Sequence, residues 1–323
     1  MAWVSVQAQT EQVRTFRFGY GLAEQSNQGR AAKVFENHLA KASQGKMKAQ
    51  TVGAAALGSD VNMQQALQEG SLEMMVGSTA TLVSICKEMA LWDTPFLFSN
   101  VNEADALLDG PIGQRILDKL PEKGLVGLVY WENGFRNLSN NKRPISRMED
   151  FAGVNLRVMQ NPVFIDSFKN LGATATPIAF SELFVALQKN TVDGQENPFN
   201  TILNSKFYEV QKYLTLTNHV YSPWIVLVSK KWWDKLSADE RALIKDAALK
   251  SRDFERQDTR AEAAKSLAAL KSKGMKVNDL AVGEAYRMRN KLTKVYTKIG
   301  TDIGLSLWID AQNELFAIRN NKP

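Results

Sequence analysis

The most restrictive feature of the chain is a run of helix-forming residues without Gly or Pro over residues 238–273. Ser237-Ala-Asp-Glu240 forms a capping box directly before it, so the sequence marks where a helix begins. A helix of this length measures about 54 Å, whereas the average helix has about 11–12 residues. Because one compact domain does not cover such a helix, we expect it to lie across two domains or to protrude.

The rest of the chain alternates between strand-like and helix-like patterns, which is typical of α/β domains. Strands are predicted at 16–21, 47–52, 72–77, 125–131, 155–159 and 224–230. Helices are predicted at 29–43, 60–70, from Pro111 onward, at 162–170, 182–189 and 198–206, and again from about 283. The length of 323 residues fits two domains. No low-complexity linker separates the two series, so we expect strands or helices to join them.

Charge and cysteine content restrict the function classes. The formal net charge is +6, from 40 basic and 34 acidic residues without a dense basic block. This predicts a mildly basic surface that favours anionic ligands, not a nucleic-acid interface. The single cysteine, Cys86, excludes an internal disulfide, and with only two histidines it argues against a zinc site.

Targeting and enzyme signatures are few. No stretch approaches the roughly 18–20 apolar residues of a membrane span. Residues 1–10 are either an arbitrary disordered tail or the remnant of a signal peptide. The second interpretation rests on residues 6–9, which resemble the small-residue end of a signal peptide. The sequence contains no GxSxG, P-loop, HExxH or GxGxxG motif, which lowers the expectation of an enzyme without excluding one.

The central part of the chain carries a specific set of motifs. They are GFRNLSN at 134–140, RPISRMEDFAGVNLRVMQNP at 143–162, GATATPIAFSELFVALQKNTVDGQENP at 172–198 and KFYEVQKYLTLTNH at 206–219. Together with the Leu57–Asp60 step and PFLF at 95–98, they closely resemble the DctP-like solute-binding proteins of tripartite ATP-independent periplasmic (TRAP) transporters. The resemblance extends from about residue 16 to about residue 300.

This resemblance implies a two-lobed α/β fold of the type II-like periplasmic-binding-protein class, with a cleft, hinge strands and a long helix spanning both lobes. We expect lobe I to comprise 11–134 and 223–262, and lobe II to comprise 135–222 and 263–323. The implied role is capture of an organic anion in the periplasm, one per monomer, and its delivery to a TRAP membrane permease. No metal, cofactor or chemical conversion is implied.

Arg157 is the first candidate for contact with the ligand. It lies between apolar strand residues, where the family places an arginine for the ligand carboxylate, and a planar guanidinium matches a carboxylate with two parallel hydrogen bonds. Arg136 in GFRN matches a second family arginine; the alternative is an ion pair that joins the lobes. Asn197 matches a ligand-binding asparagine or caps a helix, and Phe180 lines the pocket or packs in the core.

Five further positions are weaker candidates by the same resemblance. His219 lies in the polar network behind the ligand or is an ordinary buried histidine. Trp131 and Trp224 cover a ligand or pack at the hinge. Asp60 and Ser78 are expected to face the cleft from lobe I.

The sequence also suggests roles for two acidic residues and limits the class of ligand. Glu196 and Asp193 are interpreted as structural, either in turns and caps or as partners that hold the arginines. Gly21 and Ser78 replace an Asn and a Glu of sialic-acid-binding members, which argues against sialic acid. A C4-dicarboxylate or a sugar acid such as a uronate fits the expected pocket, and smaller 2-oxo, aromatic or cyclic amino-derived acids are further alternatives. An organic-acid enzyme or a ligand sensor on the same scaffold is the alternative function.

Overall fold

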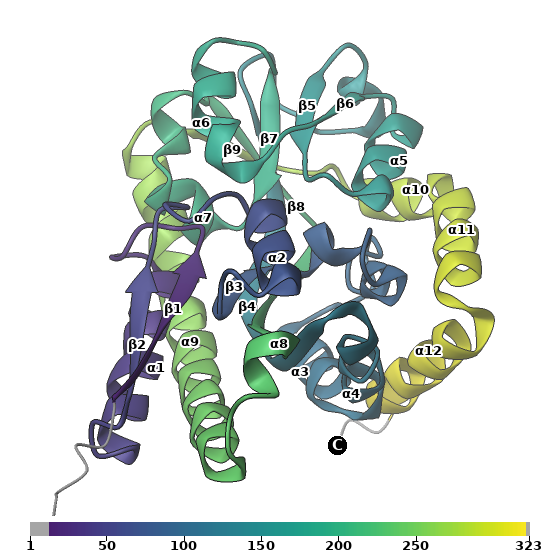
Figure 1. Ribbon diagram of the computed structural model, residues 1–323. Coiled ribbons are helices and arrows are strands. Elements are labelled where there is room, and N and C mark those ends of the chain that lie inside the picture. The colour runs from purple at the N-terminus through teal and green to yellow at the C-terminus, as the bar shows by residue number, and fades with distance from the viewer. Residues whose placement is uncertain (1–12, 321–323) are drawn as a thin grey trace, which may run out of the picture.

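The computed structural model describes residues 13–320, in which nine strands form one sheet with helices on both faces (Figure 1). Residues 1–10, interpreted from the sequence as a disordered tail or a signal-peptide remnant, lie outside the described residues. The strand order is β2-β1-β3-β8-β4-β7-β5-β6, and β9 pairs with β8. The strands are β1 Arg14–Tyr20, β2 Met47–Val52, β3 Met74–Ser78, β4 Leu125–Asn140, β5 Asn155–Val158, β6 Thr174–Pro177, β7 Gly194–Asn197, β8 Tyr213–Ser229 and β9 Lys276–Asp279.

The helices include the predicted long one. They are α1 Asn27–Ala42, α2 Asp60–Glu69, α3 Val101–Asp109, α4 Pro111–Leu117, α5 Pro162–Asn170, α6 Phe180–Gln188, α7 Phe199–Asn204, α8 Lys230–Trp233, α9 Ala238–Ser272, α10 Glu284–Lys291, α11 Thr293–Ile303 and α12 Leu305–Asn320. Short 3-10 helices η1 Thr79–Leu82 and η2 Lys87–Leu91 follow β3. Among the described residues, no helix is long and apolar enough to span a membrane.

Two long antiparallel strands, β4 and β8, pass through both lobes (Figure 1). Their lower halves join the sheet of β1, β2 and β3, because β8 also pairs with β3 over 224–228. Their upper halves join the second series, where β4 pairs with β7 over 137–140 and β8 pairs with β9 over 213–216. The register shifts between Glu132 and Gly134, at the level where the two halves meet.

The predicted strands 125–131 and 224–230 cover only the apolar halves of β4 and β8. The second half of β4 was missed because most of its side chains are buried yet polar, so it lacks the apolar pattern of a core strand. The first half of β8 contains buried apolar residues as well as polar ones, and it was not predicted. Gly134 has φ 112° and Asn218 has φ 42°, so the backbone is irregular on both strands near the crossing. The predicted lobe divisions at 134/135 and 222/223 fall in this region.

The predicted fold class is confirmed, and one part of the predicted lobe assignment is wrong. α12, assigned to lobe II with 263–323, packs against α3 and α4 of lobe I (Figure 1). Arg319 pairs with Glu103, and Arg115 pairs with Asp310 at 2.7 Å. The helices α10 and α11 carry the chain from the upper lobe down to this position.

The long helix α9 is a single helix, as predicted, and it begins with the predicted capping box at Ser237. Its first half packs with α1 and β1, through Ile244 and Ala248, in the core of lobe I. Its second half contributes Leu270 to the core formed with α6 and α7 in lobe II. The helix therefore braces both lobes from one side.

Polar contacts attach the middle of α9 to β4 just before the crossing. Glu255 accepts a hydrogen bond from the Glu132 backbone N–H at 2.7 Å, and Arg256 donates to the Tyr130 carbonyl at 3.0 Å. Arg260 forms an ion pair with the Glu132 carboxylate at 2.7 Å. Because these partners are on the strand itself, α9 stabilises the place from which the lobes diverge.

Three local features position the elements around the centre of the molecule. Ser59 caps α2, and Asp60 is its first residue. The helix α6 begins at Phe180 without a side-chain cap. Gly194 is the first residue of β7, and the glycine allows β7 to approach β4 closely.

We predict that Gly194→Ala destabilises the protein. A Cβ atom at this position lies 2.2 Å from the Ser139 carbonyl oxygen and 2.7 Å from Asn140 Cβ, so the pairing of β7 with β4 has to open. We expect the free energy of unfolding to fall by about 1–3 kcal/mol in urea titrations. Gly21→Ala is the matched control, since its Cβ meets only Asp60 Oδ1 at 3.6 Å. Equal stability of the two variants would contradict the close-approach argument.

Candidate ligand-binding site

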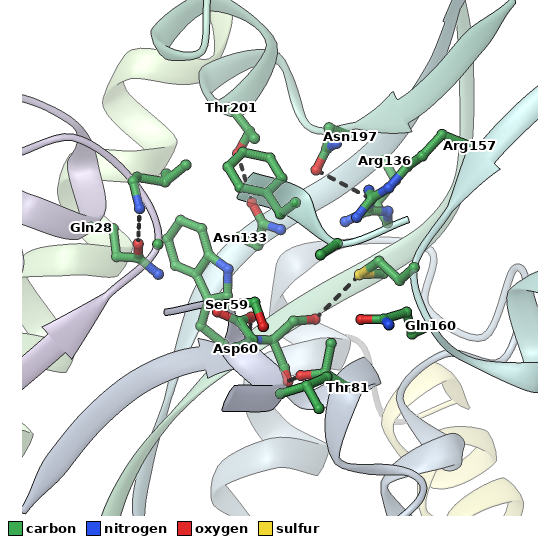
Figure 2. Close-up of a pocket in the computed structure, with 18 residues that line it drawn as sticks. Gln28, Ser59, Asp60, Thr81, Asn133, Arg136, Arg157, Gln160, Asn197 and Thr201 are labelled. Atoms are coloured by element: carbon green, nitrogen blue, oxygen red, sulfur yellow. Dashed lines mark hydrogen bonds between the residues drawn. The ribbon is translucent and has the colours of Figure 1, made fainter. Parts of the chain in front are cut away.

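A cavity with about 580 Å³ of empty volume, partly open to solvent, lies between the lobes (Figure 2). Its lower wall comes from the ends of β1 and β3 and the start of α2, and its upper wall from β5, β7 and the start of α6. Seven predicted residues line it: Arg157, Arg136, Asn197, Phe180, Asp60, Ser78 and Trp224. The other two candidates, Trp131 and His219, do not line it.

Arg157 is the least satisfied charge in the cavity. It lies on β5, its side chain is only 2% exposed, and its Nε donates to the Ile178 carbonyl at 2.8 Å. Within residues 13–320, no acceptor pairs with its two terminal nitrogens. Burial lowers the pKa of Arg157 to about 10, so the group stays charged at neutral pH. A buried cation without a partner calls for an anionic ligand.

The start of α6 adds to this positive end of the cavity. Ala179 precedes the helix and offers no side-chain cap, and both Ala179 and Phe180 line the cavity. Uncapped N–H groups at a helix start carry partial positive charge. Because Arg157 is held by the neighbouring Ile178 carbonyl, its guanidinium and the helix start lie at the same end of the cavity.

Arg136 is fully buried and already has a carboxylate partner, the alternative that the sequence left open. Its Nε donates to Glu196 Oε2, and its Nη2 donates to Glu196 Oε1 at 2.8 Å and to Asn197 Oδ1 at 3.2 Å. Its Nη1 lies 3.5 Å from Ser222 Oγ. The structural role predicted for Glu196 agrees with this pairing.

His219 stands behind this ion pair and does not line the cavity. Its Nε2 lies 3.1 Å from Glu196 Oε2, and its Nδ1 lies 2.8 Å from Thr217 Oγ1. Burial alone raises the pKa of the Glu196 carboxyl, but Arg136 and His219 together hold that pKa below its usual value. His219 therefore supports the ion pair from behind the cavity, which agrees with its expected place in a polar network, and it does not itself reach the cavity.

Asn197 joins the ion pair to the cavity. Its Oδ1 accepts from Arg136, and its Nδ2 donates to Gln195 Oε1 at 2.6 Å, so its orientation is fixed. The residue lies on β7 directly opposite Asn137 of β4. One N–H of its amide remains for a ligand, because only one donor bond is made within the described chain.

Asp60 and Ser78 form the lower wall, as predicted. Asp60 Oδ2 accepts the backbone N–H of Ser78 at 2.9 Å, and its carboxylate lies against Gly77, where a Cβ atom would be 3.0 Å away. Burial raises the pKa of Asp60, opposed by the Ser78 N–H and by the charge of Arg157. Ser78 Oγ reaches across to Met159 Sδ at 3.5 Å.

The apolar surface of the cavity comes from Phe180, Trp224 and Met159. The Phe180 ring packs edge-on against Phe207, with 6.0 Å between ring centroids, so it serves the core and the cavity together. Trp131 is completely buried and packs edge-on against Phe18 at 6.3 Å. The prediction of ligand contact is corrected for Trp131, because its neighbour Trp224 covers the cavity in its place.

Sequence reasoning missed several polar residues of the cavity. Gln28, Thr81, Asn133 and Gln160 line it, and Figure 2 shows them around its lower part and sides. Gln28 and Asn133 are buried amides, and only their burial distinguishes them from surface residues of the same type. A single sequence carries no signal of that burial, apart from the position of Asn133 immediately before the GFRN motif.

Comparison with known proteins gives a consistent result. Residues 18–302 match the family model of DctP, described as bacterial extracellular solute-binding protein, family 7. A "Solute-binding protein" from Verminephrobacter eiseniae is 43% identical over 266 residues, which cover 82% of this chain and 79% of that protein.

Two solved structures have the same fold and carry sugar acids. The sugar acid binding protein of Advenella mimigardefordensis, in complex with galactonate, has TM-score 0.92 and 46% identity, covering 96% of this chain and 99% of that one. A TRAP periplasmic solute binding protein from a Polaromonas species, bound to D-erythronate, has TM-score 0.89 and 38% identity, covering 93% and 98%.

The two arginines are predicted to differ in their effect on stability. Arg136→Ala leaves the Glu196 carboxylate buried without its cation, and we expect a loss of about 3–5 kcal/mol in the free energy of unfolding of the unliganded protein. Arg157→Met removes an unpaired buried charge, and we expect unchanged or higher stability. Urea unfolding of both variants measures this difference. A loss at Arg157 as large as that at Arg136 would contradict the pairing described here.

Proposed function

The chain belongs to the DctP family, family 7 of the bacterial extracellular solute-binding proteins, and from this membership we propose that it captures a small organic carboxylate between its lobes. The named relatives are binding proteins, not enzymes. The proposed ligands are C4-dicarboxylates or sugar acids, the classes that the relatives' names contain.

The main support for this proposal is the buried guanidinium of Arg157, whose terminal nitrogens have no acceptor among the described residues. A carboxylate that enters the cavity loses its hydration, and a charge-assisted pair with a guanidinium compensates for that loss. The terminal nitrogens of Arg157 have no acceptor in the described chain, so such a ligand displaces no internal partner. Asn197 and the start of α6 supply further donors at the same end.

The remaining parts of the function concern delivery. We propose that the protein works as a monomer in the periplasm and presents its closed, loaded form to the membrane permease of a TRAP transporter. The support comes from relatives that are named periplasmic binding proteins. The lobe division at 134/135 and 222/223 belongs to the same proposal, since closure requires two bodies joined at β4 and β8.

Ligand binding is expected to require a carboxylate and Arg157. We expect galactonate to raise the melting temperature, while galactitol, which has hydroxyl groups at both ends, leaves it unchanged. Arg157→Lys keeps the charge but loses the planar fork, and we expect affinity to fall by about 2–5 kcal/mol in calorimetry. Other acids, such as erythronate and succinate, extend the panel. If no acid in the panel binds, or if the best acid binds the Arg157→Lys variant equally well, the proposal is wrong.

Closure is expected to accompany binding. A ligand that contacts both walls of the cavity favours the closed arrangement, because some of its contacts exist only there. Small-angle X-ray scattering should therefore show a smaller radius of gyration at saturating ligand. The Arg157→Met variant at the same ligand concentration serves as the control. An identical scattering curve for the loaded and unloaded wild-type protein would separate binding from closure.

A further inference from the structure

The charges around the cavity are distributed unequally, and from them we propose that this chain selects polyhydroxylated monocarboxylates and rejects dicarboxylates, with Asp60 as the residue that discriminates. This inference rests on the proposed function, since it assumes that one carboxylate binds at Arg157. It narrows the ligand to one of the two classes that the family relationship leaves open.

The cavity offers only one cation to a ligand. Its charged lining residues within the described chain are Asp60, Arg136 and Arg157. The guanidinium of Arg136 is neutralised by Glu196 through two hydrogen bonds, which leaves Arg157 as the cation without a carboxylate partner. A second ligand carboxylate would be buried without a counter-charge, which is costly.

Asp60 places a negative charge where that second carboxylate would lie. It belongs to the lobe opposite Arg157, and Figure 2 shows the two side chains on different sides of the cavity. Its Oδ2 is held by the Ser78 N–H, whereas Oδ1 accepts no hydrogen bond from residues 13–320. Gly21 leaves this oxygen open, because a Cβ atom there would approach it to 3.6 Å.

Burial raises the pKa of Asp60, but the surroundings of its carboxylate oppose that rise through the Ser78 N–H and the charge of Arg157. Asp60 is also the first residue of α2, where the N-terminal end of the helix stabilises a negative charge. An ionised carboxylate only accepts hydrogen bonds. It therefore binds a ligand hydroxyl through the hydroxyl hydrogen and repels a ligand carboxylate.

Two buried amides complement Asp60 with donors. Gln28 Oε1 accepts the Leu22 backbone N–H at 2.9 Å, and Asn133 Oδ1 accepts from Thr201 Oγ1 at 2.9 Å. Because their oxygens are used inside the protein, their NH2 groups are the parts available to a ligand. Neutral donors together with an acceptor match hydroxyl groups, each of which donates and accepts.

Matched pairs of acids test the inference on the wild-type protein. Erythronate and meso-tartrate share a C4 chain and its configuration, and they differ only in a terminal CH2OH or carboxylate. Galactonate and galactarate form the corresponding C6 pair. Calorimetry is done at mildly alkaline pH, which favours the ionised form of Asp60, because burial raises its pKa. We expect at least one of the aldonates to bind. Its dicarboxylate counterpart should have an affinity that is lower by about 100-fold or more.

Asp60→Asn tests the discriminating residue. Asparagine keeps the size of the side chain and an oxygen for the Ser78 N–H, but it removes the charge and adds a donor. We expect the preference for the aldonate to narrow by at least about tenfold. Asp239→Asn is the matched control, because Asp239 also lies in the first turn of a helix, α9, but does not line this cavity. The control variant should keep the wild-type preference.

The outcomes separate this inference from the proposed function. If meso-tartrate or galactarate binds the wild-type protein as tightly as its partner, the inference is overturned while carboxylate capture stands. It is also overturned if neither aldonate binds but another acid does so through Arg157, or if Asp60→Asn folds and leaves the preference unchanged. If Asp60→Asn does not fold, the affinities of the wild-type protein for the two aldonate–dicarboxylate pairs test the inference by themselves. Failure of every acid overturns the proposed function itself.

Discussion

The buried ion pair between Arg136 and Glu196 is the interaction on which the architecture of the site depends. It joins β4 to β7 where the polar half of the sheet begins, and His219 and Asn197 are both oriented by it. Neither side chain is exposed, so removal of either partner leaves the other charge buried and unpaired, which is costly. Because Arg136 is satisfied by Glu196, the two arginines of the cavity have different tasks, and only Arg157 stands ready for a ligand.

This division of tasks explains how a cavity with several polar groups acquires a direction. The positive end comes from Arg157 and the start of α6, on elements of the upper lobe. The lower wall holds the carboxylate of Asp60, and Gln28 faces the cavity from α1. Under the proposed function, a ligand with one charged end and several hydroxyl groups satisfies both walls together.

The sequence was sufficient for the fold class, the long helix and the family, because each depends on local patterns that burial does not obscure. The 238–273 run and the capping box at Ser237 predicted α9 to within one residue of its end. The polar half of β4 could not be predicted, because a buried hydrophilic strand has no apolar alternation. The placement of α12 against lobe I was missed for a different reason, since an amphipathic helix shows which face is buried but not which partner covers it.

The same limit applies within the site. The motif residues Arg157, Arg136 and Asn197 were found by resemblance, but the partner that neutralises Arg136 was left as one of two alternatives, because only the three-dimensional arrangement decides it. Trp131 and Trp224 lie opposite each other in the strand register, and sequence treats them alike. Their different depth, one in the core and one at the cavity, follows from the packing of Phe18 against Trp131.

The course of β4 and β8 through both lobes has a consequence for how the molecule folds and unfolds. Neither lobe is a continuous piece of the chain, because β4 leads out of the first lobe, β8 leads back into it, and α12 returns to it from the far end. Residues distant in sequence must meet before either core is complete, which places a large loop-closure cost early in folding. Neither lobe can therefore be excised as a fragment that retains its own core.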